Sequence, residues 1–156
     1  MNAFISYGDA SDQITALRLQ ALGAVNGLTV YVPPADTRQN SEALSNAESQ
    51  QKLRDAEVVL GVVGSGLTEA CRQELNAALT LKKNMIVMTS PGLAAQLEPY
   101  FGPNIVEIDP ANPGGAEMGL MGYLNNIDAQ QSAKTALLAL GTLTLGLLLL
   151  APANRS

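Results

Sequence analysis

The chain has 156 residues, 47% of them hydrophobic, which suits one domain with a substantial core and excludes a disordered chain. It carries a net charge of −5 and no run of Lys or Arg, so no nucleic acid partner is expected, because phosphate neutralisation needs clustered cations. The absence of His excludes Ser-His catalysis and His-ligated metal sites, and the single Cys excludes an internal disulfide.

Strand-like and helix-like segments alternate along the chain. Apolar strands are predicted at residues 3–7, 28–32, 57–63, 84–89 and 104–108. The continuous β-branched run at 57–63 is typical of a central strand that is buried on both faces. Helices are predicted at residues 11–25, 42–55, 68–83 and 116–129, with a short turn or helix near 93–97. Thr68 is expected to cap the third of them. The helix at 11–25 is expected to be amphipathic, with apolar positions at Ile14, Leu17, Leu22 and Val25 and with Ala16, Leu19 and Ala21 between them.

This alternation predicts an α/β fold with a flavodoxin-like, five-stranded parallel sheet and helices on both faces. Ligands of such sheets bind beyond the carboxyl ends of the strands. The loops that follow Tyr7, Val32, Val63 and Thr89 are therefore the expected places for a site.

The predicted third helix carries one carboxylate away from its solvated face. At about 100° per residue, Glu74 lies about 60° from Cys71, among small and apolar neighbours. Burial of an unpaired charge is costly, so two explanations stay open. Either Glu74 lies at the border of the helix and reaches water along its stem, or it is a catalytic carboxylate that faces a cleft.

Three segments, in order, resemble a Toll/interleukin-1 receptor (TIR) domain. FISY (residues 4–7) resembles the family's first motif, and TVYVPP (29–34) falls at its second strand and the loop that follows. EVVLGVVGSGLTEACRQEL (57–75) resembles the third strand and helix, where Cys71, Glu74 and Leu75 match a Cys-x-x-Glu-Leu pattern. The resemblance covers roughly residues 1–130 and implies the TIR fold.

The resemblance also implies an activity. Many TIR domains, notably bacterial ones, cleave NAD between nicotinamide and ribose, and some cyclise or transfer the product. Glu74 falls at the family's catalytic glutamate, so NAD is the expected substrate, with no separate cofactor and no metal. A carboxylate there would stabilise the oxocarbenium-like ribose, while cationic nicotinamide needs no protonation to leave.

The candidate substrate-binding residues are Tyr7, Gly8, Arg38, Ser65, Gly66 and Cys71. Tyr7 is either an aromatic at the pocket rim or a core aromatic, and Cys71 is expected to be a small core residue rather than a nucleophile. Some NAD-cleaving members have basic residues after the tyrosine, whereas this chain has Gly8 and Asp9. Arg38 is the candidate substitute for the missing phosphate contact.

Residues 135–151 form an uncharged stretch of 17 residues, close to the length that spans a bilayer core. We therefore expect a TIR domain at residues 1–132 and a hydrophobic, membrane-anchoring helix at 133–156. Small residues at Thr135, Ala139, Thr142 and Gly146 form a stripe that would favour self-association. An apolar helix between subunits of a soluble assembly is the alternative, and a core position in the monomer is the least expected.

These expectations favour an enzyme that is held at a membrane, with its TIR domain in the cytoplasm and active on self-assembly, in bacterial antiphage immunity. Two other functions stay open. One is a non-catalytic TIR adaptor that acts through TIR–TIR contacts, in which the third helix and residues 33–40 are interaction surfaces. The other is an enzyme like the nucleoside deoxyribosyltransferases, which have a related fold and also use a glutamate.

Overall fold

A computed structural model describes residues 1–35 and 46–150. Its centre is a five-stranded sheet in the order β2-β1-β3-β4-β5, with every neighbouring pair parallel. The strands are β1 (Asn2–Tyr7), β2 (Thr29–Tyr31), β3 (Val58–Val63), β4 (Asn84–Thr89) and β5 (Ile105–Glu107). The predicted flavodoxin-like parallel sheet is thereby confirmed.

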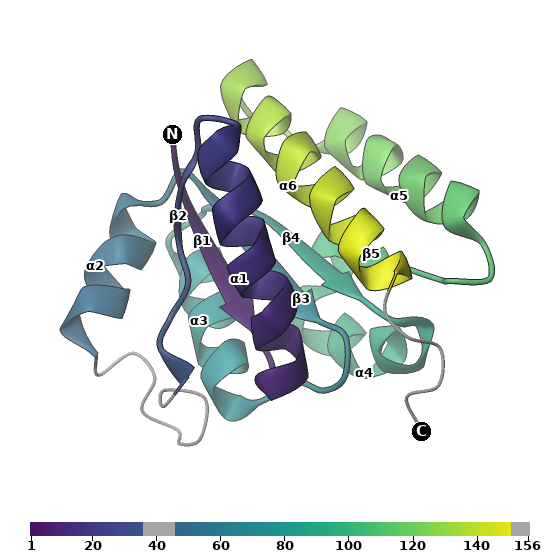
Figure 1. Ribbon diagram of the computed structural model, residues 1–156, viewed down its shortest axis with the longest axis horizontal. Helices are drawn as coiled ribbons and strands as arrows, with labels where there is room; N and C mark the ends of the chain where they lie inside the picture. The colour runs from purple at the N-terminus through teal and green to yellow at the C-terminus, as the bar shows by residue number, and fades with distance from the viewer. Residues whose placement is uncertain (36–45, 151–156) are drawn as a thin grey trace.

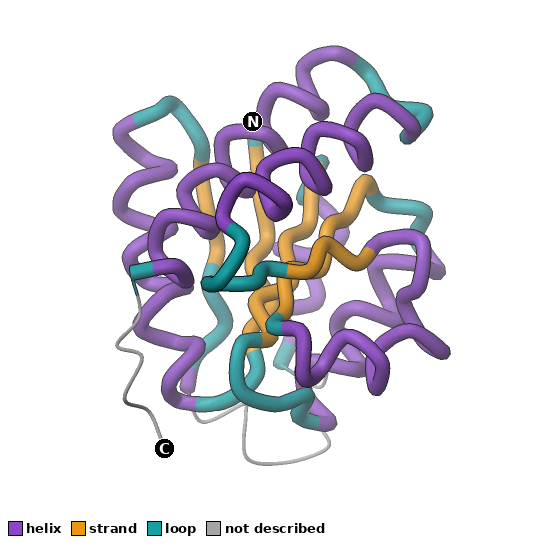
Figure 2. The backbone as a smooth tube through the Cα atoms, turned by 90° about the vertical axis from the view of Figure 1, so that its right-hand side faces the viewer, coloured by secondary structure: helices purple, strands orange, loops and turns teal. Residues whose placement is uncertain are grey.

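Six α-helices among the described residues flank the sheet in two layers (Figures 1 and 2). They are α1 (Ala10–Val25), α2 (Ala47–Asp55), α3 (Glu69–Thr80), α4 (Pro91–Phe101), α5 (Pro113–Asn126) and α6 (Gln131–Leu149), and a short 3-10 turn, η3 (Gly102–Asn104), follows α4. One core cluster joins the sheet to α1, α5 and α6, and a second joins it to α2, α3 and α4.

Strand β3 is the middle of this arrangement, and all six of its residues are buried. Leu60 and Val62 belong to one core cluster, whereas Val59 and Val63 belong to the other, as the alternation of side chains along a strand requires. The prediction of a central strand buried on both faces is confirmed. Such a strand needs a helical layer on each side.

Helix α6 covers the centre of one of those faces, where Figure 1 shows it between α1 and α5. It contacts α1, α5, β3 and β4. Its buried residues are Ala133, Ala136, Leu137, Leu140, Gly141, Thr144 and Leu145. The expectation that a core position is the least favoured for this helix is wrong, because Leu60, Val62, Ile86 and Met88 share a cluster with it.

Within the described part of the chain, α6 also has the length and the apolar composition that would allow it to cross a membrane. The small-residue stripe predicted on it faces outward in part. Thr135, Thr142 and Gly146 are exposed, whereas Ala139 is partly buried.

Helix α1 buries a different face from the predicted one. Its buried residues are Asp12, Ala16, Leu19 and Gly23. Ile14, Leu17 and Val25 are exposed, and Leu22 is 38% exposed. Small residues explain the difference, because a Cβ at Gly23 would lie only 2.7 Å from a methyl of Val30, so α1 lies close to the sheet along this side.

Several boundaries differ from the prediction. Helix α4 is longer than the expected turn near 93–97, and α5 begins at Pro113, before the predicted start at residue 116. Proline in the first helical turn and the side chain of Asn112, which accepts from the Gly115 amide at 3.1 Å, explain this start of α5. Helix α2 is described from Ala47, and residues 42–45 of its predicted range lie outside the described residues.

Candidate functional site

The carboxyl ends of β1 and β3 lie side by side at the point where the strand order reverses. From β1 the chain crosses to β2 on one side, and from β3 it crosses to β4 on the other. In open parallel sheets this switch point is where ligands bind. Two loops begin there, at Gly8-Asp9 after β1 and at residues 64–68 after β3, which lead into α1 and α3.

Glu74 lies on α3 with a fully buried side chain. Its Oε1 accepts a hydrogen bond of 2.7 Å from the hydroxyl of Ser6, on β1. The prediction that Glu74 leaves the solvated face of the helix is confirmed, and the explanation that it reaches water along its stem is wrong.

Ser6 joins the carboxylate to the thiol of Cys71. Its Oγ lies 3.2 Å from Cys71 Sγ as well as 2.7 Å from Glu74 Oε1. A hydroxyl carries a single hydrogen, and a carboxylate is the stronger acceptor, so Ser6 donates to Glu74 and leaves a lone pair for the thiol hydrogen. We call Ser6, Cys71 and Glu74 the buried polar cluster.

The sequence did not identify Ser6 as a site residue. The signal was a hydroxyl inside an otherwise apolar strand, since every other residue from Ala3 to Tyr7 is hydrophobic. Ser6 is fully buried and faces α3, together with Phe4 two positions earlier. A buried hydroxyl needs a partner, and here that partner is the carboxylate.

Side chains of α1 close the switch point by binding the loop after β3. Asp12 Oδ1 accepts from the Gly64 amide at 3.1 Å. The Ser65 hydroxyl lies 2.8 Å from Asp9 Oδ1 and 3.4 Å from Asp12 Oδ2. Thr68, which caps α3 as predicted, also reaches the Gly8 carbonyl at 3.4 Å.

The two loops approach each other closely at Gly8. A Cβ at this position would lie 2.2 Å from the carbonyl oxygen of Gly66 and 2.8 Å from Asp12 Oδ2. The group that approaches Gly8 is therefore the backbone of the loop at Gly66. Together with the polar contacts above, this packing leaves the loops in direct contact over the switch point.

The carboxyl groups of Asp9, which caps α1, and of Asp12, in its first turn, have opposite pKa shifts. Burial, together with the nearby charge of Asp9, raises the pKa of Asp12 to about 6. Burial also acts to raise the pKa of Asp9, but hydrogen bonds from Ser65 and from the backbone amides of Asp12 and Ser11 outweigh it, so that pKa is lowered. Asp9 is therefore ionised throughout the neutral range, whereas Asp12 holds its proton until the pH rises through about 6.

Of the other candidate residues, one is in the core, two are in the loop after β3 and one lies outside the described residues. Tyr7 is fully buried, and its hydroxyl donates to the Pro33 carbonyl at 2.8 Å, so its ring has no exposed face in this structure. Ser65 is exposed at the loop tip, and Gly66 next to it is partly buried. Arg38 lies outside the described residues.

The charge around Ser65 limits what this loop can bind. Asp9 and Asp12 both lie within hydrogen-bond distance of its hydroxyl, so a phosphate placed here would face two carboxyl groups. A ribose hydroxyl, which can donate to a carboxylate, fits this environment better. Within the described residues, no group of three or more His, Cys, Asp or Glu could hold a metal ion.

The fold and the switch point define a doubly wound α/β protein with the flavodoxin-like strand order and a buried carboxylate beside the switch-point strands. A comparison of the chain with models of known protein families gave no match, and a search among curated proteins also gave none.

Proposed function

We propose that this protein is a TIR-like enzyme that cleaves NAD between nicotinamide and ribose. The observation that supports this most is the full burial of Glu74 beside the switch-point strand β1, with its carboxylate oriented by Ser6. In this proposal Glu74 is the catalytic residue. NAD is the substrate, and the reaction uses neither a separate cofactor nor a metal.

The chemistry follows from a desolvated negative charge. As nicotinamide leaves, the ribose becomes oxocarbenium-like, and a carboxylate held next to it stabilises that positive charge. Burial strengthens the effect, since little water remains to screen the interaction. Nicotinamide leaves as a neutral group from a cationic bond, so one carboxylate is sufficient and no general acid is required.

Substrate entry requires the two loops to separate. The contacts that must open are those of Asp12 with Gly64, Asp9 with Ser65 and Thr68 with Gly8. Opening would uncover the loop carbonyls and amides at Gly8 and Gly66 and give a ribose access to Glu74. This requirement fits an enzyme that becomes active only on assembly, since a neighbouring copy would stabilise the open loops.

A bacterial antiphage role and a membrane-associated location with the domain in the cytoplasm remain predictions alongside this proposal. The support for a membrane is α6, which has the length and composition of a spanning helix. A spanning state would require α6 to leave β3 and β4, because Leu137 and Leu140 are buried in the core in the state described here.

One observation favours a second candidate, a non-catalytic TIR adaptor. A Cβ at Gly8 would lie 2.2 Å from the Gly66 carbonyl oxygen, so the two loops are closed over the switch point. In an adaptor, the buried polar cluster would only tie α3 to β1, and the outer faces of the helices would bind other TIR domains.

A measurement of nicotinamide release from NAD separates the enzyme from the adaptor. The full chain is concentrated until it assembles, incubated with NAD and compared with Glu74→Gln, which keeps the size of the side chain and an acceptor for Ser6. The matched control is Glu69→Gln, an exposed carboxylate of the same helix that pairs with Arg72. We expect release by the wild type and the control and loss of about 100-fold or more in Glu74→Gln. Equal release by Glu74→Gln would remove Glu74 from the mechanism, and no release in any assembly would favour the adaptor.

A further inference from the structure

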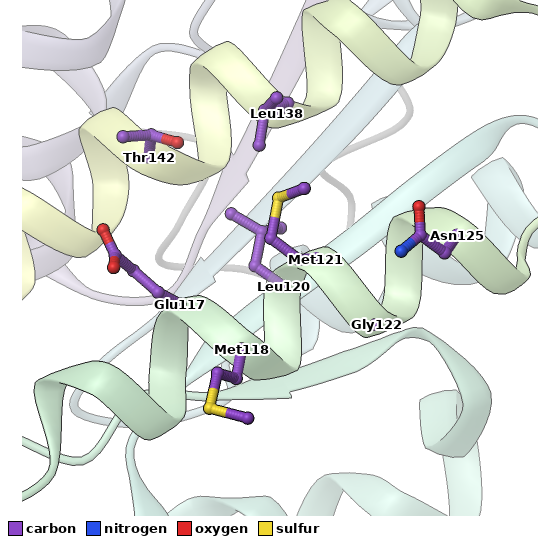
Figure 3. A pocket seen from close by; sticks show the side chains of 8 residues that line it. All are labelled: Glu117, Met118, Leu120, Met121, Gly122, Asn125, Leu138 and Thr142. Carbon is purple, nitrogen blue, oxygen red and sulfur yellow. The ribbon is translucent and has the colours of Figure 1, made fainter.

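A groove of about 580 Å³ runs between α5 and α6 on the outside of the molecule (Figure 3). Its lining is mainly apolar and consists of Glu117, Met118, Leu120, Met121, Gly122, Asn125, Leu138 and Thr142. Met118 is 76% exposed and Met121 is 45% exposed. Methionine adapts its shape to a partner, so exposed methionines in a groove are typical of a binding surface.

The outward face of α5 differs from that of an ordinary solvated helix. On α3, the exposed Glu69 forms an ion pair with the partly buried Arg72, and further polar residues lie beside them. Helix α5 has a single charged residue, Glu117, between Pro113 and Asn126. The face that α5 turns to solvent is therefore apolar or uncharged along nearly its whole length.

Two exposed glycines of α5 have no packing role within one copy of the chain. A Cβ at Gly119 or Gly122 would meet nothing within 4 Å. Glycine weakens a helix more than any residue except proline, so its use in this helix needs another explanation. Gly141 of α6 shows the contrast, because there a Cβ would lie 2.9 Å from the methyl groups of Leu120. Bare backbone at Gly119 and Gly122 allows a second helix to approach closely.

The few charges of the two helices lie at opposite ends of the groove. Figure 3 shows Glu117 beside Thr142 at one end and Asn125 at the other. Lys134, the one charged residue of α6, precedes Leu138 by one helical turn and so lies on the same side of α6, toward the Asn125 end. A two-fold axis through the middle of the groove exchanges its ends, which brings Glu117 of one copy to Lys134 of the other.

We propose that the α5–α6 groove is the interface of a two-fold homodimer of this chain. The two helices contribute one negative and one positive charge, whereas the chain as a whole carries −5, so this face meets a second copy with little repulsion. Helix α1 also exposes apolar residues, Ile14 and Leu17, but neither of them lines the groove. The inference does not depend on the enzymatic function.

The test is sedimentation velocity of the full chain between about 1 and about 100 μM. The wild type is expected to dimerise reversibly. Met118→Glu places a charge in the groove and is expected to weaken the dimer by about tenfold or more. Ile14→Glu is the matched control, since it changes an exposed apolar residue of α1 that lies outside the groove (56% exposed, against 76% for Met118) and is expected to leave the dimer unchanged.

Charge exchange tests the two-fold pairing itself. Glu117→Lys and Lys134→Glu are each expected to weaken the dimer about five- to tenfold, and the double variant is expected to return to within about threefold of the wild type. A wild type that is monomeric at every concentration would overturn the proposal, as would a dimer that is unaffected by Met118→Glu or a double variant that shows no recovery. A monomer that binds neutral lipid vesicles through Met118 would show that lipid occupies the groove instead, which also overturns it.

Discussion

The hydroxyl of Ser6 and the carboxylate of Glu74 form a buried hydrogen bond of 2.7 Å between β1 and α3. The two residues are 68 positions apart in the chain and both are fully buried. A buried carboxylate is tolerated only with donors in fixed positions. This bond therefore couples the orientation of Glu74 to the packing of the first strand.

Ser6→Ala removes that donor while leaving the strand otherwise unchanged. We expect the free energy of unfolding to fall by about 1–3 kcal/mol, because a buried carboxylate loses part of its compensation. Urea unfolding measures this, and a cycle with Glu74→Leu isolates the pair, with an expected coupling of about 1 kcal/mol or more. Two single effects that simply add would show that the bond contributes nothing to stability.

The raised pKa of Asp12 predicts that the stability of the protein depends on pH. Its pKa rises from 3.8 to about 6 in the folded chain, mainly by burial. The folded state therefore holds this proton more tightly than the unfolded state, so the contribution of Asp12 to stability is fully present below pH ~4 and is lost as the pH rises through ~6. The loss is on the order of 2–3 kcal/mol.

Asp12→Asn removes that loss, because the amide oxygen still accepts from Gly64 but carries no charge. We expect the variant to exceed the wild type in unfolding free energy at pH 8 and to match it at about pH 4. Urea unfolding at the two pH values measures the difference, and Asp128→Asn, at an exposed loop position, is the control. A variant that is less stable than the wild type at pH 8 would mean that the charge itself holds the loop.

Gly8→Ala tests the contact between the loops. The new methyl would lie 2.2 Å from the Gly66 carbonyl oxygen, so the backbone must shift, at an expected cost of about 1–3 kcal/mol. Hydrogen exchange at the Gly64 amide, which donates to Asp12, should accelerate in the variant. Gly66→Ala is the matched control, because a Cβ there meets nothing within 4 Å, and an equal effect of both changes would contradict the contact as its cause.

Substitutions at two positions of α6 test whether this helix packs in the core of the monomer. Leu140 is fully buried, so Leu140→Ala is expected to lower the free energy of unfolding by about 2–5 kcal/mol. Gly146 is exposed and a Cβ there would meet nothing within 4 Å, so Gly146→Ala should raise the free energy of unfolding by about 0.5–1 kcal/mol. Chemical unfolding of the detergent-free protein measures both, and a neutral Leu140→Ala would place α6 away from the sheet.

The packed position of α6 also predicts how the protein behaves in cells. With Leu137 and Leu140 in the core, we expect alkaline carbonate to release the protein from any membrane fraction. A spanning helix resists that extraction, because its removal would expose the whole apolar segment to water. Retention in the carbonate-resistant pellet would therefore support the sequence-based prediction of an anchor.

Much of the fold was predictable from local patterns. The continuous run at Val58–Val63 indicated a strand buried on both faces, and Thr68 marked the start of α3. The helical wheel placed Glu74 away from the solvated face of α3. The structure agrees, because the side chain is fully buried. Each of these inferences depends on spacing within one segment, and that spacing is a property of the chain itself.

The partner of α6 was not predictable in the same way. A helix with apolar residues on most sides suits lipid, a subunit interface or a protein core equally well, because burial of apolar surface is non-directional. The same limit applies to α1, where Ala16 and Gly23 rather than Ile14 and Leu17 face the sheet. Small residues permit close packing, but their spacing along a helix does not show whether they face the core or the solvent.

The sequence by itself therefore determined the order of strands and helices, the parallel sheet and the unusual position of one glutamate. Only the tertiary structure decided that Ser6 binds that glutamate, that Asp12 and Gly8 close the loops above the switch point, and that α6 completes the core. The physical reason is that periodicity defines which face of an element is buried, whereas the residue that covers that face comes from a distant part of the chain.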